Sequence, residues 1–411
     1  MAESSLIGQI TDWLVDQSLG EPDMVELFEG VCKRLYAIGV PVSRANLMWS
    51  TLHPLFQAEN VLWKRGEKAE LKQFPHQDAD TKQWHRSPMF YMLEANIAVL
   101  RRRLTGPGAL LDFEIAKDLA QEGYTDYLVM ASELFSSTIY PNSNARRGMF
   151  VTWASDRPGG FIDDDLAALQ RIQRRLAIAC KTVIQSRISN NIAEAYLGKQ
   201  TGKRVLAGSI RLGDGEQTRA LVWYSDLRSS TRLAETMPSA DFLQLLNVYF
   251  ECAARPAIAA GGEVLAFVGD AVLAIFPIDD DSELPALTRK VTEALNQSLV
   301  LADKVNAERA EKGLEPIRYG LGLNVGEVMY GNIGVPERLA FSAIGPTVIE
   351  VARIEKMTKQ IGSRVLATRE VAAIEPALWR SMGLHRLEGL GQPQELFGFQ
   401  EEEARKASLA A

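Results

Sequence analysis

Two aspartates bracket the most constraining stretch of this sequence, which predicts a strand, two helices and a β-hairpin in succession. Residues 220–227 (ALVWYSDL) form an apolar run of strand length with Asp226 near its end. Residues 229–260 carry apolar side chains at helical spacing and stop at a pair of glycines. Residues 263–276 then predict a hairpin with Asp270 at its turn. This order of elements favours an α+β fold.

The two aspartates are expected to meet at one edge of the sheet if their strands lie side by side. Arg228 is the basic residue closest to either of them in sequence. Two carboxylates are costly to hold together unless a cation joins them. Mg²⁺ prefers hard oxygen ligands and is commonly shared between carboxylates and substrate phosphates. The pattern therefore predicts a magnesium site for Asp226 and Asp270, the alternative being two carboxylates in strand-end turns.

The composition of the chain excludes several classes of protein. Its 411 residues suffice for two or three domains, and its net charge of -7 argues against nucleic acid or an anionic membrane as the main partner. No apolar run approaches the roughly 20 residues that span a bilayer, and the N-terminus lacks a basic signal-peptide region. Cys32, Cys180 and Cys252 offer neither a disulfide framework nor metal-ligand spacing. We therefore expect a cytoplasmic protein.

Four segments of the second half resemble the class III nucleotide cyclases, the adenylate and guanylate cyclases. These segments are WYSDLRSST, GGEVLAFVGDAVLAIF, LGLNVGEVMYGNIG and IGPTVIEVARIE. The resemblance implies that residues 215–401 form a ferredoxin-like βααβ catalytic domain and that residues 402–411 are a tail. It also implies a strand pair over residues 321–334. The catalytic site of this family lies between two chains, so the resemblance implies a homodimer, or a heterodimer with another cyclase chain.

One face of such a site holds metal ions and phosphates. The resemblance implies that Asp226, Leu227 and Asp270 hold two ions, Mg²⁺ or Mn²⁺. These ions serve the in-line attack of the ribose 3′-oxygen on the α-phosphate of a nucleoside triphosphate. Ser230 and Thr231 lead into a helix whose N-terminal amides are expected to face the phosphates.

The opposite face of the site departs from the family pattern. Arg353 stands at the position of the arginine that stabilises the transition state, and Ser342 stands at a base-reading position. Ala266 replaces the lysine that reads adenine, and Ile349 replaces the asparagine that orients the ribose. Isoleucine can neither donate nor accept a hydrogen bond. Glu388 lies where a basic residue often meets the triphosphate, which we expect it to repel.

These features predict a class III nucleotide cyclase of the adenylate cyclase type, which converts ATP to cAMP and pyrophosphate in intracellular signalling. Because several expected side chains are replaced, two alternatives stay open. The chain is then either the metal-bearing half of a heterodimer, or a cyclase-shaped regulatory module without turnover.

The first part of the chain predicts a second domain of alternating strands and helices, over residues 1–185. The predicted strands cover residues 44–53, 59–64, 126–135 and 147–152, the predicted helices cover residues 5–17, 23–38, 88–100, 112–123 and 166–185, and residues 65–80 are expected to be a loop. The last helix is expected to continue to about residue 196. Six aromatic residues either line a ligand pocket or belong to the core, and we prefer the core. They are Trp49, Phe56, Trp63, Trp84, Tyr91 and Tyr127.

This first part resembles the GAF-like sensor domains that precede some bacterial cyclases. The segments that carry the resemblance are VPVSRANLMWSTLHPLF, TDYL and SDRPGGF. It implies that the first domain regulates the second. Residues 186–214 contain several glycines and predict either a plain flexible linker or, by resemblance to the cyclases, a helical transducing element.

Overall fold

The computed structural model of the chain describes residues 2–76, 81–134 and 148–401. The chain divides into two compact units, residues 1–195 and residues 196–411. The division falls within the stretch for which a linker is predicted. Within the described ranges, no helix combines the length and the apolar character needed to cross a bilayer.

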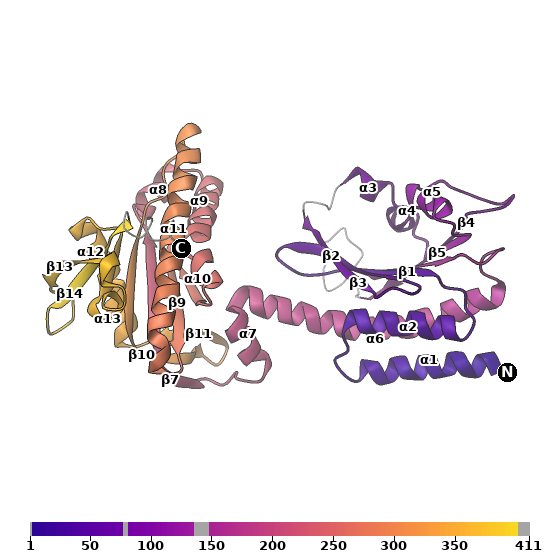
Figure 1. Cartoon of the computed structure of the whole chain (residues 1–411), viewed down its shortest axis with the longest axis horizontal. Coiled ribbons are helices and arrows are strands. Elements are labelled where there is room, and N and C mark those ends of the chain that lie inside the picture. The colour runs from indigo at the N-terminus through magenta and orange to yellow at the C-terminus, as the bar shows by residue number, and fades with distance from the viewer. Residues whose placement is uncertain (1, 77–80, 135–147, 402–411) are drawn as a thin grey trace. The chain divides into compact units, whose positions relative to one another are not determined.

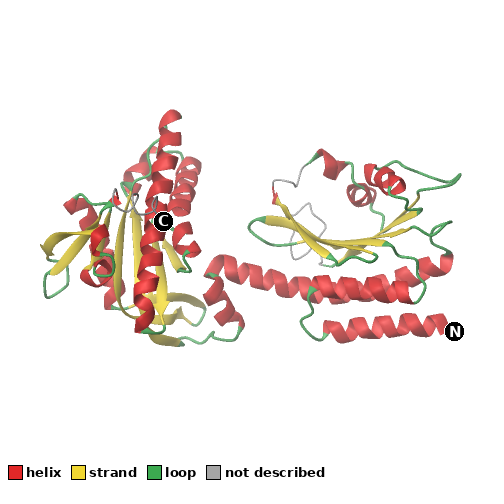
Figure 2. Ribbon diagram, in the orientation of Figure 1, coloured by secondary structure: helices red, strands yellow, loops and turns green. Residues whose placement is uncertain are grey.

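The first unit is built on one antiparallel sheet with helices on both faces (Figures 1 and 2). The strand order is β3-β2-β1-β6-β5-β4. The strands are β1 Arg44–Ser50, β2 Phe56–Lys64, β3 Glu70–Pro75, β4 Val99–Arg103, β5 Asp126–Glu133 and β6 Gly148–Ser155. The helices are α1 Ala2–Ser18, α2 Met24–Ala37, α3 Lys82–His85, α4 Pro88–Ala95, α5 Glu114–Gln121 and α6 Asp163–Leu197. The main core lies between the sheet and helices α1, α2 and α6, and a smaller core lies under α4 and α5.

Two of the predicted elements in this unit are wrong. The predicted loop at 65–80 contains the edge strand β3, whose side chains are almost all exposed, so it lacks the apolar alternation of a half-buried strand. The predicted helix at 88–100 ends at Ala95 because Asn96 adopts the left-handed conformation, with φ 53°. The edge strand β4 follows. The predicted strand ends at residues 135 and 147 lie outside the described residues.

The second unit contains an eight-stranded sheet of order β13-β14-β12-β10-β7-β9-β8, with β11 paired to β10. Its strands are β7 Gly215–Leu227, β8 Glu263–Val268, β9 Ala271–Ile278, β10 Tyr319–Val335, β11 Arg338–Ile344, β12 Val365–Thr368, β13 Trp379–His385 and β14 Gln394–Phe399. Its helices are α7 Lys199–Leu206, α8 Ser230–Thr236, α9 Ser239–Ala253, α10 Arg255–Ala259, α11 Leu284–Glu311, α12 Pro346–Ile361 and α13 Arg369–Ala372. The predicted α+β class is confirmed.

Strand β7 lies in the middle of this sheet and separates two cores. Leu221 and Trp223 point into the core formed with helices α9, α10 and α11. Ala220 and Val222 point into a second core on the opposite face, together with Val351 of α12. Figure 1 shows these helices on opposite sides of the sheet. Because side chains alternate along a strand, Asp226 lies on the α12 face.

The glycine-rich segment 321–334 is not the strand pair that the resemblance implies. It belongs to one continuous strand, β10, which pairs with β7 on one side and with β12 and then β11 on the other. Its glycines serve close packing rather than a turn. A Cβ atom on Gly322 would lie 2.7 Å from the main-chain oxygen of Val351, and one on Gly326 would lie 2.6 Å from Thr347 Oγ1. Both neighbours belong to α12, which thereby packs directly on the strand.

A buried carboxylate attaches α7 to the sheet. Glu263, at the start of β8, is 6% exposed and accepts hydrogen bonds from the main-chain nitrogen of Thr201 at 2.6 Å and from its hydroxyl at 2.7 Å. Tyr330 donates to the other carboxylate oxygen at 2.5 Å. The N-cap residue of α7 makes no side-chain cap of its own. Glu263 therefore takes the role of the missing N-cap.

We predict that Thr201→Val loosens α7 without disturbing the sheet. Valine keeps the branched shape but removes the hydroxyl donor, at a cost of about 1 kcal/mol. Amide hydrogen exchange over residues 199–206 should then become about fivefold faster, while exchange in β7 stays unchanged. The control is Thr218→Val, whose hydroxyl donates to the neighbouring main-chain oxygen of Arg219. Unchanged exchange in α7 would show that this hydroxyl does not hold the helix.

Candidate active site

The structure brings Asp226 and Asp270 together at the edge where β7 meets the hairpin of β8 and β9. Asp226 pairs in register with Ala271, the residue after Asp270, and the main-chain nitrogen of Leu227 donates to the main-chain oxygen of Asp270 at 3.3 Å. Burial raises the pKa of Asp226 to about 6, assisted by the charge of Asp270 and a hydrogen bond with it. The positive charge of Arg228 acts in the opposite direction.

This carboxylate pair fits a hard divalent cation. A cation between the carboxylates would offset both the burial of the Asp226 charge and its repulsion by Asp270. Mg²⁺ commonly uses one or two carboxylates and completes its coordination with water and phosphate oxygens. Among the described residues, no group of three or more His, Cys, Asp and Glu side chains is arranged to hold a metal. The side chain of Leu227 is buried in the core, so only its main chain is available at this edge.

Two of the predicted nucleotide contacts lie directly beyond the aspartate strand. Ser230 and Thr231 are the first residues of α8, which begins three residues after Leu227. Ser229 adopts the left-handed conformation at the N-cap, with φ 61°, and its side chain does not cap the helix. The Ser229 side chain therefore accepts no hydrogen bond from the first main-chain amides of α8.

The remaining predicted site residues lie on other elements. Ala266 is in β8 opposite Leu273, and Ser342 is in β11 opposite Gly331. Ile349 is on α12 and is 60% exposed. These three residues thus lie on three different elements, none of which is the strand β7 that carries Asp226.

Arg353 of α12 forms an ion pair with Glu388. Its Nη1 atom lies 3.3 Å from Glu388 Oε2, and its Nε atom is buried without a hydrogen-bond partner. The Glu388 side chain is 79% exposed, so the pair is only weakly stabilising. Sequence reasoning expected this glutamate to repel a triphosphate. The structure adds a second effect, since Glu388 also neutralises the arginine to which the resemblance assigns the transition state.

Sequence reasoning missed a buried carboxylate in the same region. Glu355 of α12 is 3% exposed, and its Oε1 atom lies 3.7 Å from Arg228 Nη1. Burial raises the pKa of Glu355 to about 7, and the charge of Arg228 opposes that rise. The sequence does hold a signal for it. Glu355 follows Val351 by one helical turn and precedes Thr358 by another, so an acidic residue stands on the inward face of the helix.

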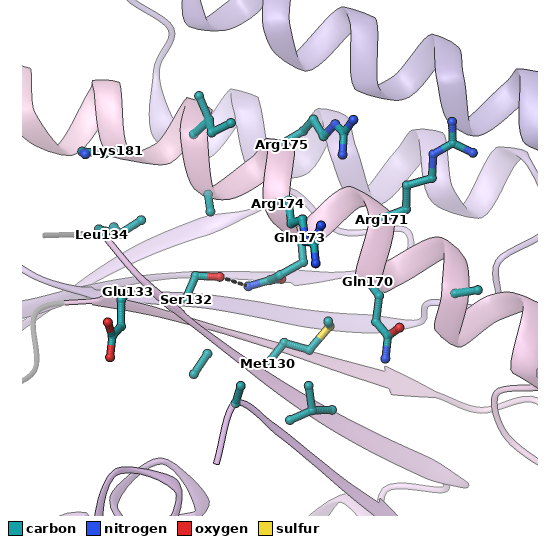
Figure 3. Close-up of a pocket in the computed structure, with 16 residues that line it drawn as sticks. Met130, Ser132, Glu133, Leu134, Gln170, Arg171, Gln173, Arg174, Arg175 and Lys181 are labelled. Atoms are coloured by element: carbon teal, nitrogen blue, oxygen red, sulfur yellow. Dashed lines mark hydrogen bonds between the residues drawn. The ribbon is translucent and has the colours of Figure 1, made fainter. Parts of the chain in front are cut away.

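The first unit contains an open cavity of about 900 Å³ between β5 and α6 (Figure 3). Gln173 of α6 reaches across it and donates to Ser132 Oγ of β5 at 2.9 Å. None of the six aromatic residues considered for a ligand pocket lines this cavity. Trp49, Trp63 and Tyr127 are each 2% exposed and belong to the core, as preferred. The core prediction is wrong for Tyr91, which is 46% exposed, and Phe56 and Trp84 are only partly buried.

We predict that Asp226→Asn changes how stability depends on pH. A carboxyl group whose pKa rises from 3.8 to about 6 on folding stabilises the fold below pH 3.8, and this contribution is lost as the pH rises through 6. Asparagine does not titrate. In a chelating buffer, the melting temperature of the variant relative to the wild type should therefore rise by about 2–4 °C between pH 5 and pH 7.5. Exposed Asp241 provides the control, as Asp241→Asn. A difference independent of pH would contradict the assignment.

Comparison with known proteins identifies relatives that match part of this chain. No family model matches the chain. Its sequence is 32% identical over 167 residues to the adenylate cyclase of Anabaena cylindrica. That alignment covers 40% of this chain and 32% of the cyclase. It is 32% identical over 208 residues to an uncharacterized protein of Mycobacterium tuberculosis, which covers 48% of this chain and 36% of that protein. The chain thus spans about a third of the length of these curated relatives.

Solved structures that match the chain include the adenylyl cyclase CyaB from P. aeruginosa, with a TM-score of 0.40 and 22% identity over 46% of this chain and 96% of that chain. A bacterial light-regulated adenylyl cyclase matches with a TM-score of 0.46 and 18% identity over 62% of this chain and 83% of that chain. Since these scores and identities are low, the relationship rests on the sequence match and on the motifs around the two aspartates. The chain is accordingly similar in sequence to an adenylate cyclase over 167 residues, and the motifs around its two aspartates resemble those of the class III nucleotide cyclases.

Proposed function

We propose that the chain is a class III nucleotide cyclase of the adenylate type, which converts ATP to cAMP and pyrophosphate. The observation that carries the proposal is the Asp226–Asp270 pair, whose burial and close approach favour a bound cation. The sequence relationship to an adenylate cyclase supports the choice of ATP. Cations bound at this pair would polarise the ribose 3′-hydroxyl and offset the phosphate charge.

The protein's own groups would then bind and orient the nucleotide. The first amides of α8, at Ser230 and Thr231, are suited to phosphate oxygens. Ser342 can donate a hydrogen bond to a base, and Arg353 can stabilise charge at the α-phosphate. Because the family resemblance implies a catalytic site between two chains, the proposal requires a second cyclase chain to complete the site. We infer a homodimer, with a heterodimer as the alternative.

The proposal assigns a regulatory role to the first unit and a catalytic role to the second. Residues 1–185 would act as a GAF-like regulatory domain, and residues 215–401 as the catalytic domain. Residues 186–214 would transmit the regulatory signal, and the attachment of α7 through Glu263 supports a mechanical link there.

Two observations favour a second candidate, a cyclase-shaped module that binds nucleotide with little or no turnover. Ile349 cannot orient a ribose by hydrogen bonding. The Glu388 carboxylate also forms an ion pair with Arg353, with 3.3 Å between Glu388 Oε2 and Arg353 Nη1. Loss of a single oriented hydrogen-bond donor typically costs on the order of 10²–10³ in rate. A chain with several such losses would need a partner chain that supplies the missing groups, or would be inactive.

Turnover assays on the full chain test the first candidate. Purified protein is incubated with each nucleoside triphosphate and Mg²⁺ or Mn²⁺, and cyclic product and pyrophosphate are measured. We expect cAMP and an equal amount of pyrophosphate from ATP, and we expect Asp270→Ala to abolish both. Persistent activity in that variant would show that the cation assignment is wrong. If no triphosphate is converted by the chain alone, activity regained with a cyclase homologue bearing the lysine and asparagine would select the heterodimer.

We predict that Glu388→Gln strengthens nucleotide binding. The change removes a negative charge near the triphosphate and releases Arg353 from its exposed ion pair. Since exposed pairs contribute up to about 1 kcal/mol, affinity should rise about two- to fivefold. Calorimetric titration with 3′-deoxy-ATP, which cannot cyclise, measures the effect. Exposed Glu337, in the turn between β10 and β11, provides the control as Glu337→Gln. Unchanged or weaker binding in the Glu388 variant would contradict the inhibitory role of this carboxylate.

A further inference from the structure

Arg228 stands beside the aspartate pair but is bound elsewhere. It follows Asp226 by two residues and lies in the turn directly after β7, which ends at Leu227. Its guanidinium group instead contacts two residues of α12. Nη1 lies 3.7 Å from Glu355 Oε1, and Nη2 donates to Thr358 Oγ1.

The two residues that hold the guanidinium group are themselves fixed. Glu355 is 3% exposed and Thr358 is 1% exposed. Thr358 Oγ1 also donates to the main-chain oxygen of Glu355, which locks its rotamer against the helix. A buried carboxylate is costly unless a cation pairs with it, and Arg228 is the cation that Glu355 contacts. The contact is therefore built into the core rather than formed by chance at the surface.

Gly320 leaves the space for this arrangement. It lies on β10 directly opposite Asp226. A Cβ atom there would lie 2.1 Å from Glu355 Oε1, 2.4 Å from Thr358 Oγ1 and 2.6 Å from Arg228 Nη2. The three side chains meet over a glycine, so the position of the guanidinium group depends on three separate elements, β7, β10 and α12.

An arginine in this place would compete with a cation for the two aspartates. Its guanidinium group lies beside Gly320, the residue directly opposite Asp226, and its charge opposes the rise in the pKa of Asp226 that burial causes. A guanidinium group binds carboxylates strongly, often through two parallel hydrogen bonds, and would compete with a metal ion for the same oxygens. The chain therefore needs a way to keep the group off the aspartates.

We propose that Glu355 is a positioning residue that holds the Arg228 guanidinium group away from Asp226 and Asp270 and so leaves both carboxylates available to divalent cations. The inference rests on the cation site of the proposed function but does not require turnover. It predicts that Arg228 becomes a competitor of the metal when Glu355 loses its charge.

Mn²⁺ binding to the full chain, followed by the paramagnetic resonance signal of unbound Mn²⁺, tests the inference. We expect Glu355→Gln to weaken Mn²⁺ binding by roughly tenfold, the effect of one charge-assisted arginine–carboxylate contact. We expect the double variant Arg228→Met with Glu355→Gln to bind within about threefold of the wild type, because the competing group is gone. If Glu355 had a purely structural role, the added Arg228→Met change would not restore Mn²⁺ binding.

The matched control is Glu350→Gln, a carboxylate on the same helix that accepts a hydrogen bond from Asn324. It should bind Mn²⁺ as the wild type does. Two results would overturn the proposal. One is that the Glu355→Gln variant binds Mn²⁺ as tightly as the wild type. The other is that the double variant binds Mn²⁺ as weakly as Glu355→Gln alone. If Glu355→Gln does not fold, as judged by circular dichroism, Thr358→Val replaces it. Loss of the second guanidinium contact should also weaken Mn²⁺ binding, and unchanged binding would overturn the proposal.

The same titrations separate this inference from the proposed cation site. Asp270→Asn should abolish specific Mn²⁺ binding in the wild-type background. If the wild type binds no Mn²⁺, or binds it independently of Asp270, the cation site itself is wrong. If binding depends on Asp270 and the Glu355 variant leaves it unchanged, only the role of Glu355 is wrong.

Discussion

The burial and close approach of two carboxylates constrain the electrostatics of the second unit. Asp226 lies near the end of the central strand β7, Asp270 lies at the turn of the adjoining hairpin, and burial together with their proximity raises the pKa of Asp226 to about 6. The sheet is packed on both faces, so the strands cannot move apart to relieve the repulsion. The fold therefore maintains an unfavourable charge arrangement that a divalent cation would offset. Such arrangements are concentrated at functional sites.

Two arginines of the second unit are each paired with a glutamate, and the two pairs differ in burial. Glu355 is buried, so its contact with Arg228 is part of the packing of α12 against the sheet. Glu388 is exposed, so its pair with Arg353 is screened by solvent and easily exchanged for another anion. The first pair is therefore the stronger restraint on its arginine. Both pairs join α12 to segments distant in sequence.

The sequence predicted well where the signal is local. The hairpin over residues 263–276 and the strand ending near Asp226 follow from apolar runs and a tight glycine–aspartate turn, and the structure contains both. It failed at the edge strands β3 and β4, whose exposed or weakly patterned side chains carry no two-residue period. It also failed at β10, where glycines that serve helix packing were expected to mark a strand pair.

The sequence by itself determined which acidic residues stand at strand ends and turns, because strand period and turn chemistry act over a few neighbouring residues. It also carried the likeness to the cyclases and the replacement of Ala266, Ile349 and Glu388. Only the tertiary structure decided which carboxylate each arginine contacts. That choice depends on how α12 packs over β10 and β7, and on how the chain returns after β13, since the paired residues are brought together by elements far apart along the chain.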